Sequence, residues 1–133
     1  MRVAIYIQSK KLGGTNTVVK NLISNYAAMD ADAVFSHTRD SVRFFSFNSE
    51  VPVFMTADNL KEKFSSYDSI VTKPVFFIPL ELDGVRNVVQ VDYRVIKYNK
   101  NGIVEKDLFL EVFEFGKDGK ISSIRQWTAT AAW

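Results

Sequence analysis

Hydrophobic residues change their spacing about halfway along the chain. Between residues 17 and 27 they recur every three or four positions, which predicts an amphipathic helix. Shorter helices are predicted for residues 31 to about 38 and after Thr56, which is a candidate N-cap. Three apolar residues are expected on one face of this third helix: Leu60, Phe64 and Tyr67. The first half of the chain is therefore predicted to be mainly helical.

The second half has the pattern of strands. Four of the five predicted strands follow one another through short turns, which favours an antiparallel meander. The five predicted strands cover residues 41–47, 71–82, 85–98, 103–115 and 120–130. Asp83-Gly84 is a two-residue hairpin signal between two of them. Pro74 and Pro79 place the strand that contains them at an edge or a bulge of the sheet, because proline cannot donate a ladder hydrogen bond.

The first sixteen residues show no clear period. Val3 to Ile7 fit either a short edge strand or a disordered lead, and Gly13-Gly14 is expected to end whatever precedes it. We therefore expect an N-terminal lead over residues 1–16 and a single domain over residues 17–133.

Composition narrows the functional classes. The chain has 133 residues, a formal net charge of +2 and no cysteine. Thiolate catalysis and thiolate metal sites are thus excluded, and the single His37 excludes a multi-histidine metal cluster. No cofactor is expected.

Lysine and arginine are spread along the chain rather than clustered, which disfavours nucleic acid as a partner. No apolar run approaches the length of a signal-peptide core or of a membrane span, so we expect a cytoplasmic protein without a membrane partner.

The turn Asn99–Gly102 predicts how the two central strands pair. If Tyr98 lies opposite Ile103, side chains of both strands alternate between two faces. One face is then mixed polar and aromatic: Val88, Gln90, Asp92, Arg94, Asp107, Phe109, Glu111 and Phe113. The other face is almost wholly apolar: Val89, Val91, Tyr93, Val95, Lys106, Leu108, Leu110 and Val112.

Two interpretations of these faces are open. In the first, the valine-rich face is the core under the helices and the charged face is solvated. In the second, the polar and aromatic face lines an enclosed pocket and the valine-rich face is a dimer interface. The pattern of residues is compatible with both.

The order of the elements resembles that of the nuclear transport factor 2-like superfamily, to which SnoaL-like polyketide cyclases and ketosteroid isomerases belong. The segments that carry the resemblance are Leu22–Ala33, Thr38–Val42 and Glu111–Ile121, and it covers roughly residues 17–130. It implies a cystatin-like α+β cone, with three N-terminal helices packed on a curved antiparallel meander sheet. It also implies an apolar pocket inside the cone and dimerisation through the outer face of the sheet, which is the second interpretation.

The resemblance further implies roles for individual residues. Glu111 takes the position of the isomerases' oxyanion-hole aspartic acid, and Tyr26 that of the tyrosine that partners it. Both a protonated carboxylic acid and a tyrosine hydroxyl can donate a hydrogen bond to a developing enolate. The general-base position falls near Phe45, which cannot accept a proton. Isomerase chemistry of that type is then either lost or moved to another carboxylate, such as Asp92 or Asp107.

These considerations give a set of expected site residues. The catalytic candidates are Glu111, Tyr26 and Asp92. The expected ligand-binding residues are Phe45, Phe64, Gln90, Arg94, Phe109, Phe113 and Gln126. No metal ligand is expected.

The last strand has two possible registers. A four-residue turn at Gly116–Gly119 places Gln126 on the Glu111 face, whereas a three-residue turn places Arg125 and Trp127 there. The resemblance implies the first register, with Trp127 on the outer face. The expected homodimer interface on that face comprises Val89, Val91, Tyr93, Leu108, Leu110 and Val112.

Two functional hypotheses follow. The first is a SnoaL-like domain that binds a small, largely apolar molecule in the cone, with metal-independent isomerase- or cyclase-like acid/base chemistry on an uncharged polycyclic or ketone-like ligand. The second is a non-catalytic homodimeric interaction or assembly module with the same fold. The sequence leaves open whether the chain is an enzyme.

Overall fold

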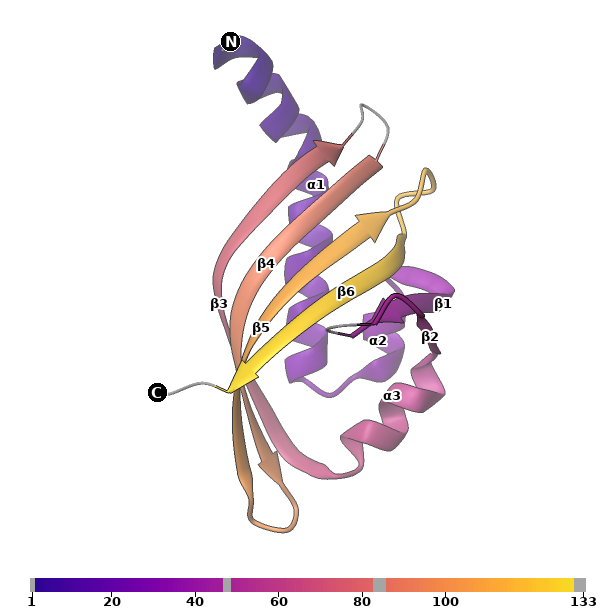
Figure 1. Cartoon of the computed structure of the whole chain (residues 1–133), viewed down its shortest axis with the longest axis vertical. Coiled ribbons are helices and arrows are strands. Elements are labelled where there is room, and N and C mark those ends of the chain that lie inside the picture. Colours follow the sequence, from indigo (N-terminus) through magenta and orange to yellow (C-terminus); the bar gives the residue numbers. More distant parts are fainter. Residues whose placement is uncertain (1, 47–48, 83–85, 131–133) are drawn as a thin grey trace.

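The residues that the structure describes form three helices and six strands (Figure 1). The computed structural model describes residues 2–46, 49–82 and 86–130. The helices are α1 (Arg2–Ala27), α2 (Ala31–Phe35) and α3 (Ala57–Phe64). The strands are β1 (Thr38–Phe45), β2 (Val53–Met55), β3 (Tyr67–Leu82), β4 (Arg86–Asn99), β5 (Val104–Phe115) and β6 (Ile121–Thr130). This is the expected α+β class.

All six strands form one sheet with the order β2-β1-β6-β5-β4-β3. Strands β3 to β6 are the predicted antiparallel meander, while β1 pairs with β6 in parallel, so the sheet is mixed. The short strand β2 was not predicted. The sheet is strongly curved, and the helices lie on its concave side (Figure 1).

Helix α1 is longer than the sequence pattern predicts. It starts at Arg2 and continues through Gly13-Gly14, so the predicted break there is wrong, and so are both predictions for Val3 to Ile7. A helical glycine costs only about 1 kcal/mol relative to alanine. The buried face of α1, with Val19, Leu22 and Ile23, anchors the helix on the sheet, and tertiary packing of such a face supplies most helical stability in proteins.

The two short helices begin at the predicted positions, although α2 ends at Phe35, before the predicted end near residue 38. The Asp30 side chain accepts a hydrogen bond from the Ala33 N–H at 3.1 Å at the start of α2. Thr56 and Asn59 form a reciprocal capping box at the start of α3, as expected for a Thr56 N-cap. The expected apolar face of α3 holds for Leu60 and Phe64, which are buried. Tyr67, by contrast, lies beyond the helix, at the first position of β3.

The register of β4 and β5 differs by one residue from the prediction. Tyr98 pairs with Val104, not with Ile103. Ile103 belongs to the turn instead, where its carbonyl accepts hydrogen bonds from the Asn99 backbone N–H at 2.9 Å and from Asn99 Nδ2 at 3.0 Å. Gly102 supplies the positive φ of 87° that this longer turn requires. Because side chains alternate along a strand, a shift of one residue moves every β4 side chain to the other face relative to β5.

The first interpretation is therefore correct for β4, whose valine row faces the helices. The second is correct for β5, whose row with Glu111 faces the helices. On the concave face, Val91 lies opposite Glu111 and Tyr93 opposite Phe109. The predicted pocket positions of Gln90, Asp92 and Arg94 are wrong, because these residues occupy the convex face. The predicted interface positions are wrong for three residues, which are buried in the core: Val89, Val91 and Tyr93. The other three keep their predicted convex position: Leu108, Leu110 and Val112.

Burial of aliphatic side chains explains why this register wins. Val89, Val91 and Val95 are all completely buried on the concave face. Removing one such side chain from water stabilises the fold by about 1.5–3 kcal/mol. The predicted register would instead turn this row away from the helices and bring the charged row of β4 into the core.

Other strand predictions are confirmed. Strand β3 lies at the edge of the sheet, with a register shift between Pro74 and Phe76. Gln126 pairs with Glu111, and Trp127 pairs with Leu110 on the convex face, as the four-residue turn requires. The Asp83-Gly84 hairpin signal lies outside the described residues.

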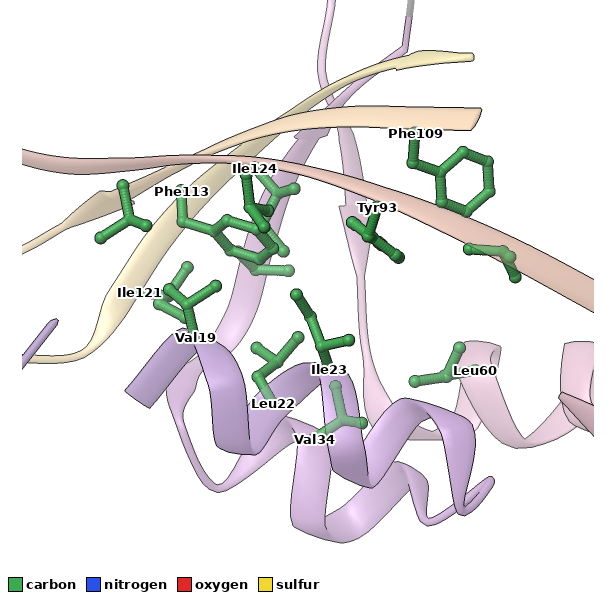
Figure 2. Packing of buried hydrophobic residues seen from close by; sticks show 14 of the residues in the cluster. Val19, Leu22, Ile23, Val34, Leu60, Tyr93, Phe109, Phe113, Ile121 and Ile124 are labelled. Carbon is green, nitrogen blue, oxygen red and sulfur yellow. The ribbon is translucent and has the colours of Figure 1, made fainter. Parts of the chain in front are cut away.

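One hydrophobic core connects the helices to the sheet (Figure 2). Val19, Leu22 and Ile23 of α1 point toward the sheet, where Phe113 of β5 and Ile124 of β6 meet them (Figure 2). Farther along the sheet, Tyr93 and Phe109 pack edge to face, with their ring centroids 5.4 Å apart. This second part of the core borders the candidate site.

The uninterrupted course of α1 yields a stability prediction. Gly14 has open space where the methyl group of an alanine would lie, so Gly14→Ala should raise the free energy of unfolding by about 0.5–1 kcal/mol, measured by urea denaturation. Gly102→Ala is the matched control and should lower stability by about 1 kcal/mol, because its φ is 87°. If Gly14→Ala were destabilising, residue 14 would not be helical.

Candidate functional site

A cavity of about 170 Å³ lies between the helices and the concave face of the sheet. Its walls are mostly apolar and aromatic, with side chains from all three helices and from β1 to β6. The few polar groups that reach it include the Tyr26 and Tyr93 hydroxyls, the Glu111 carboxyl and the Gln126 amide. An apolar cavity with a few convergent polar groups is the usual form of a small-molecule site.

Glu111 is the central polar residue of this cavity. Its side chain comes from the middle of β5 and is only 5% exposed. The Tyr93 hydroxyl donates a hydrogen bond to Oε1, and Gln126 Nε2 donates one to Oε2 at 2.8 Å. The strand register creates both contacts, because Gln126 pairs directly with Glu111 and Tyr93 lies two residues from its other partner, Val91.

Burial raises the pKa of Glu111 from 4.5 to about 7, because the charged form loses its hydration. The hydrogen bonds from Tyr93 and Gln126 and the charge of Lys97 act in the opposite direction and offset part of this effect. Near neutral pH the carboxyl group therefore exists in both protonation states. Such a group can both give and accept a proton.

Two tyrosines beside Glu111 remain protonated. Burial and the nearby Glu111 charge raise the pKa of both Tyr26 and Tyr93 above the usual value. Tyr26 packs edge to face on Phe64, with 5.4 Å between the ring centroids, and this contact fixes its ring against the cavity wall. The Tyr26 hydroxyl is therefore suited to donate a hydrogen bond to a molecule in the cavity.

Lys97 extends the polar part of the site along β4. Its Nζ lies 5.5 Å from the ring centroid of Tyr67 and 5.3 Å from that of Phe109, within the range of cation–π attraction. Burial lowers the pKa of Lys97, although the charges of Asp107, Glu105 and Glu111 oppose this change. A second lysine, Lys63 of α3, also lines the cavity.

Comparison with known proteins identifies the fold. No family model matches the sequence, and no curated protein matches it. Solved structures do match. A ketosteroid isomerase-like protein from Erwinia carotovora atroseptica has a TM-score of 0.67 and 13% identity, covering 91% of this chain and 98% of its own.

A SnoaL-like protein of unknown function from Burkholderia thailandensis gives a TM-score of 0.64 and 18% identity, covering 87% of this chain and 93% of its own. For an NTF2-like protein of unknown function from an Exiguobacterium species the TM-score is 0.63 and the identity 14%, with coverage of 83% and 99%. The chain has the nuclear transport factor 2-like fold. The fold implied by the sequence resemblance is thus confirmed, and at these identities the likeness concerns the fold alone.

The nuclear transport factor 2-like fold brings six of the ten expected site residues to the cavity. These six are Tyr26, Phe64, Phe109, Glu111, Phe113 and Gln126. The other four do not line it: Phe45, Gln90, Asp92 and Arg94. Three of these four are the β4 residues that the register shift moves to the convex face.

Phe45 lies on the opposite face of β1 from the cavity. Its ring packs against the guanidinium of Arg125, with Cζ 4.4 Å from the ring centroid. Phe44, the preceding residue, lines the cavity instead. The residue near which the sequence resemblance placed the general base thus does not reach the cavity, and the preceding residue, which does, is also a phenylalanine.

Sequence reasoning missed several residues of the site, above all Tyr93 and Lys97. Both lie on the concave row of β4 that begins with Val89, so strict alternation from Val89 would have found them once the register was known. Tyr67 was missed because it was assigned to the face of a helix.

In the described part of the chain, no helix has both the length and the apolar character needed to cross a membrane.

The raised pKa of Glu111 yields a prediction for stability against pH. Folding favours the protonated carboxyl, so the stabilisation is complete below about pH 4.5 and is lost as the pH rises through about 7. The loss amounts to about 3 kcal/mol between these limits. Glu111→Gln resembles the protonated form and should remove this part of the pH dependence, measured by urea unfolding between pH 4.5 and 8.

Glu114→Gln provides the matched control. Glu114 lies on the same strand but on the convex face, where it accepts a hydrogen bond from Ser123 Oγ at 3.2 Å. This variant should retain the slope of the wild-type profile. Identical slopes for wild type and Glu111→Gln would contradict the buried, near-neutral carboxyl.

Proposed function

We propose that this protein binds a small, largely apolar ketone-like molecule in the cavity and performs acid/base chemistry on it through Glu111. The observation that carries the proposal is a buried carboxyl group at the wall of an apolar cavity, held there by hydrogen bonds from Tyr93 and Gln126. Burial raises the pKa of this carboxyl group to about 7. A solvated carboxylate would be fully ionised at that pH and would be a weaker base.

The size of the cavity restricts the ligand. A dry cavity of about 150 Å³ accepts benzene, and the present cavity measures about 170 Å³. A ligand with a single ring matches this volume, which favours a ligand smaller than a polycyclic one. The apolar walls, which include Leu22, Phe109 and Phe113, favour an uncharged ring.

The polar groups support a specific arrangement of the ligand. Tyr26, which stays protonated, would donate a hydrogen bond to the ligand carbonyl oxygen. Glu111 in its ionised form would accept a proton from the carbon next to that carbonyl and, once protonated, return it. Tyr93 and Gln126 would hold the carboxyl in place throughout, because a carboxylate that accepts two hydrogen bonds has little freedom to rotate.

Deuterium exchange tests this proposal. Acetophenone has a single ring, a carbonyl group and acidic protons next to it, and its exchange in D₂O is followed by proton NMR. The wild-type protein should accelerate this exchange at pD 7, and Glu111→Gln should reduce the acceleration about 10²-fold or more, as expected for loss of a general base. Glu114→Gln should exchange like wild type. No acceleration by the wild-type protein would contradict the proposed chemistry.

We also propose a second role, homodimer formation through the convex face of the sheet. Five large apolar side chains on this face are 38–40% exposed: Val71, Phe76, Ile78, Leu80 and Leu108. Leu110, Val112 and Trp127 lie on the same face. We call these eight residues the outer apolar face. The polar β4 residues Gln90, Asp92 and Arg94 lie between its β3 and β5 members. Apolar side chains gathered on one exposed face favour a protein–protein interface, and assembly without catalysis would need no more than this surface.

Sedimentation velocity tests the second role. Leu108→Lys places a charge in the outer apolar face and should convert a dimer into a monomer. Val51→Lys is the control, because Val51 is 75% exposed but lies in the connection before β2, away from this face. An unchanged mass for Leu108→Lys would remove the outer apolar face as an interface.

A further inference from the structure

Lys97 is a polar residue of the cavity to which the proposed function gives no role. It follows Val95 on the concave row of β4 and lines the same cavity as Glu111. Its ammonium group is held between two aromatic rings, those of Tyr67 and Phe109, at 5.5 and 5.3 Å from their centroids. The other cavity lysine, Lys63, has an exposed side chain, whereas that of Lys97 is partly buried.

The surroundings of Lys97 favour the neutral amine more than those of a surface lysine do. Burial is the main cause of its lowered pKa, and the positive charge of Lys63 acts in the same direction. The carboxylates of Asp107, Glu105 and Glu111 oppose the change, and so does attraction to the two rings. The rings also restrict the position of the amine, which keeps it at the cavity wall.

We propose that Lys97 is a nucleophilic amine that condenses with the carbonyl carbon of a small aldehyde or ketone bound in the cavity. A lysine in an apolar pocket and beside a second cation is the usual setting for an amine that forms Schiff bases. This inference rests on the proposed function, because it needs a carbonyl compound in the cavity, and it adds a covalent step to it.

The step balances with the groups that line the cavity. The Nζ lone pair forms a bond to the carbonyl carbon, and the carbonyl oxygen takes a proton from the protonated Glu111 carboxyl. The nitrogen then returns a proton to Glu111, which leaves a neutral carbinolamine. Glu111 then gives up this proton again, so that the C–O bond breaks and the hydroxyl group leaves as water while the nitrogen lone pair forms the C=N bond. The products are one water, a protonated imine and the ionised Glu111 carboxylate, and no oxidant or reductant is needed.

Reductive trapping with benzaldehyde and sodium cyanoborohydride tests the proposal. Benzaldehyde fits a cavity that accepts one ring, and the reductant adds hydride to the imine carbon, which fixes a benzyl group on the nitrogen. Peptide mapping by mass spectrometry then gives the rate of labelling at each lysine. Lys20 is the matched reference, because its Nζ lies 5.2 Å from the Phe77 ring centroid but its side chain is exposed and outside the cavity.

Labelling of the wild-type protein at pH 7 should be severalfold faster at Lys97 than at Lys20, because Lys97 lines the cavity in which benzaldehyde would bind and Lys20 does not. Burial, which lowers the pKa of Lys97, acts in the same direction by raising the fraction of neutral amine. Lys97→Arg keeps the charge and should abolish the fast labelling, whereas Lys20→Arg should leave it unchanged. Equal rates at Lys97 and Lys20, or fast labelling at Lys63 instead, would overturn the proposal. The comparison within the wild-type protein does not depend on how either variant folds.

Benzyl alcohol separates failure of this inference from failure of the proposed function. It has the size of benzaldehyde but no carbonyl group, and its binding is followed by NMR shifts of the Phe113 and Tyr93 rings. If benzyl alcohol binds and Lys97 is not labelled selectively, only the nucleophilic lysine is overturned. If benzyl alcohol does not bind and no selective labelling occurs, the small-molecule site and the lysine are both overturned.

Discussion

Burial of one row of side chains on β4 determines which polar side chains of that strand reach the cavity. Val89, Val91 and Val95 leave water completely, and their burial selects the pairing of β4 with β5. That pairing brings Tyr93 within hydrogen-bonding distance of Glu111 and carries Lys97 to the cavity wall. The other register would give the same fold but a different site, with Asp92 in place of Tyr93. The chemistry of the cavity is therefore decided by aliphatic packing, several residues away from the groups that would react.

The same packing explains why Glu111 has unusual properties. A carboxyl group in the middle of an apolar strand face loses its hydration, and two hydrogen bonds offset only part of that loss. The fold stays stable because the surrounding aromatic and aliphatic side chains contribute far more than one desolvated group costs. Residues that reduce stability without any packing benefit are common at functional sites. The acid/base role proposed for Glu111 and the nucleophilic role proposed for Lys97 both depend on this low-dielectric environment.

Much of the fold could be predicted from the sequence, whereas the site could be predicted only in part. Periodicity located α2 and the four strands of the meander, and the Thr56 cap located the start of α3, because those signals are local. Proline positions identified β3 as an edge strand for the same reason. Two predictions failed because long-range packing overrode local propensity: the helix break at the glycine pair in α1 and the length of the turn before Val104. Residues of β5 were placed correctly and those of β4 were not, since a turn one residue longer than expected inverts one strand relative to the other.

The central claim is that Glu111 is a buried carboxyl at the wall of an apolar cavity, and an NMR titration of its side-chain carbon measures this directly. With ¹³C-labelled glutamate and Glu111→Gln for assignment, the Cδ signal of Glu111 should titrate with a pKa of about 7. A midpoint near 4.5, the ordinary value for glutamate, would place this group in water and would contradict a buried site.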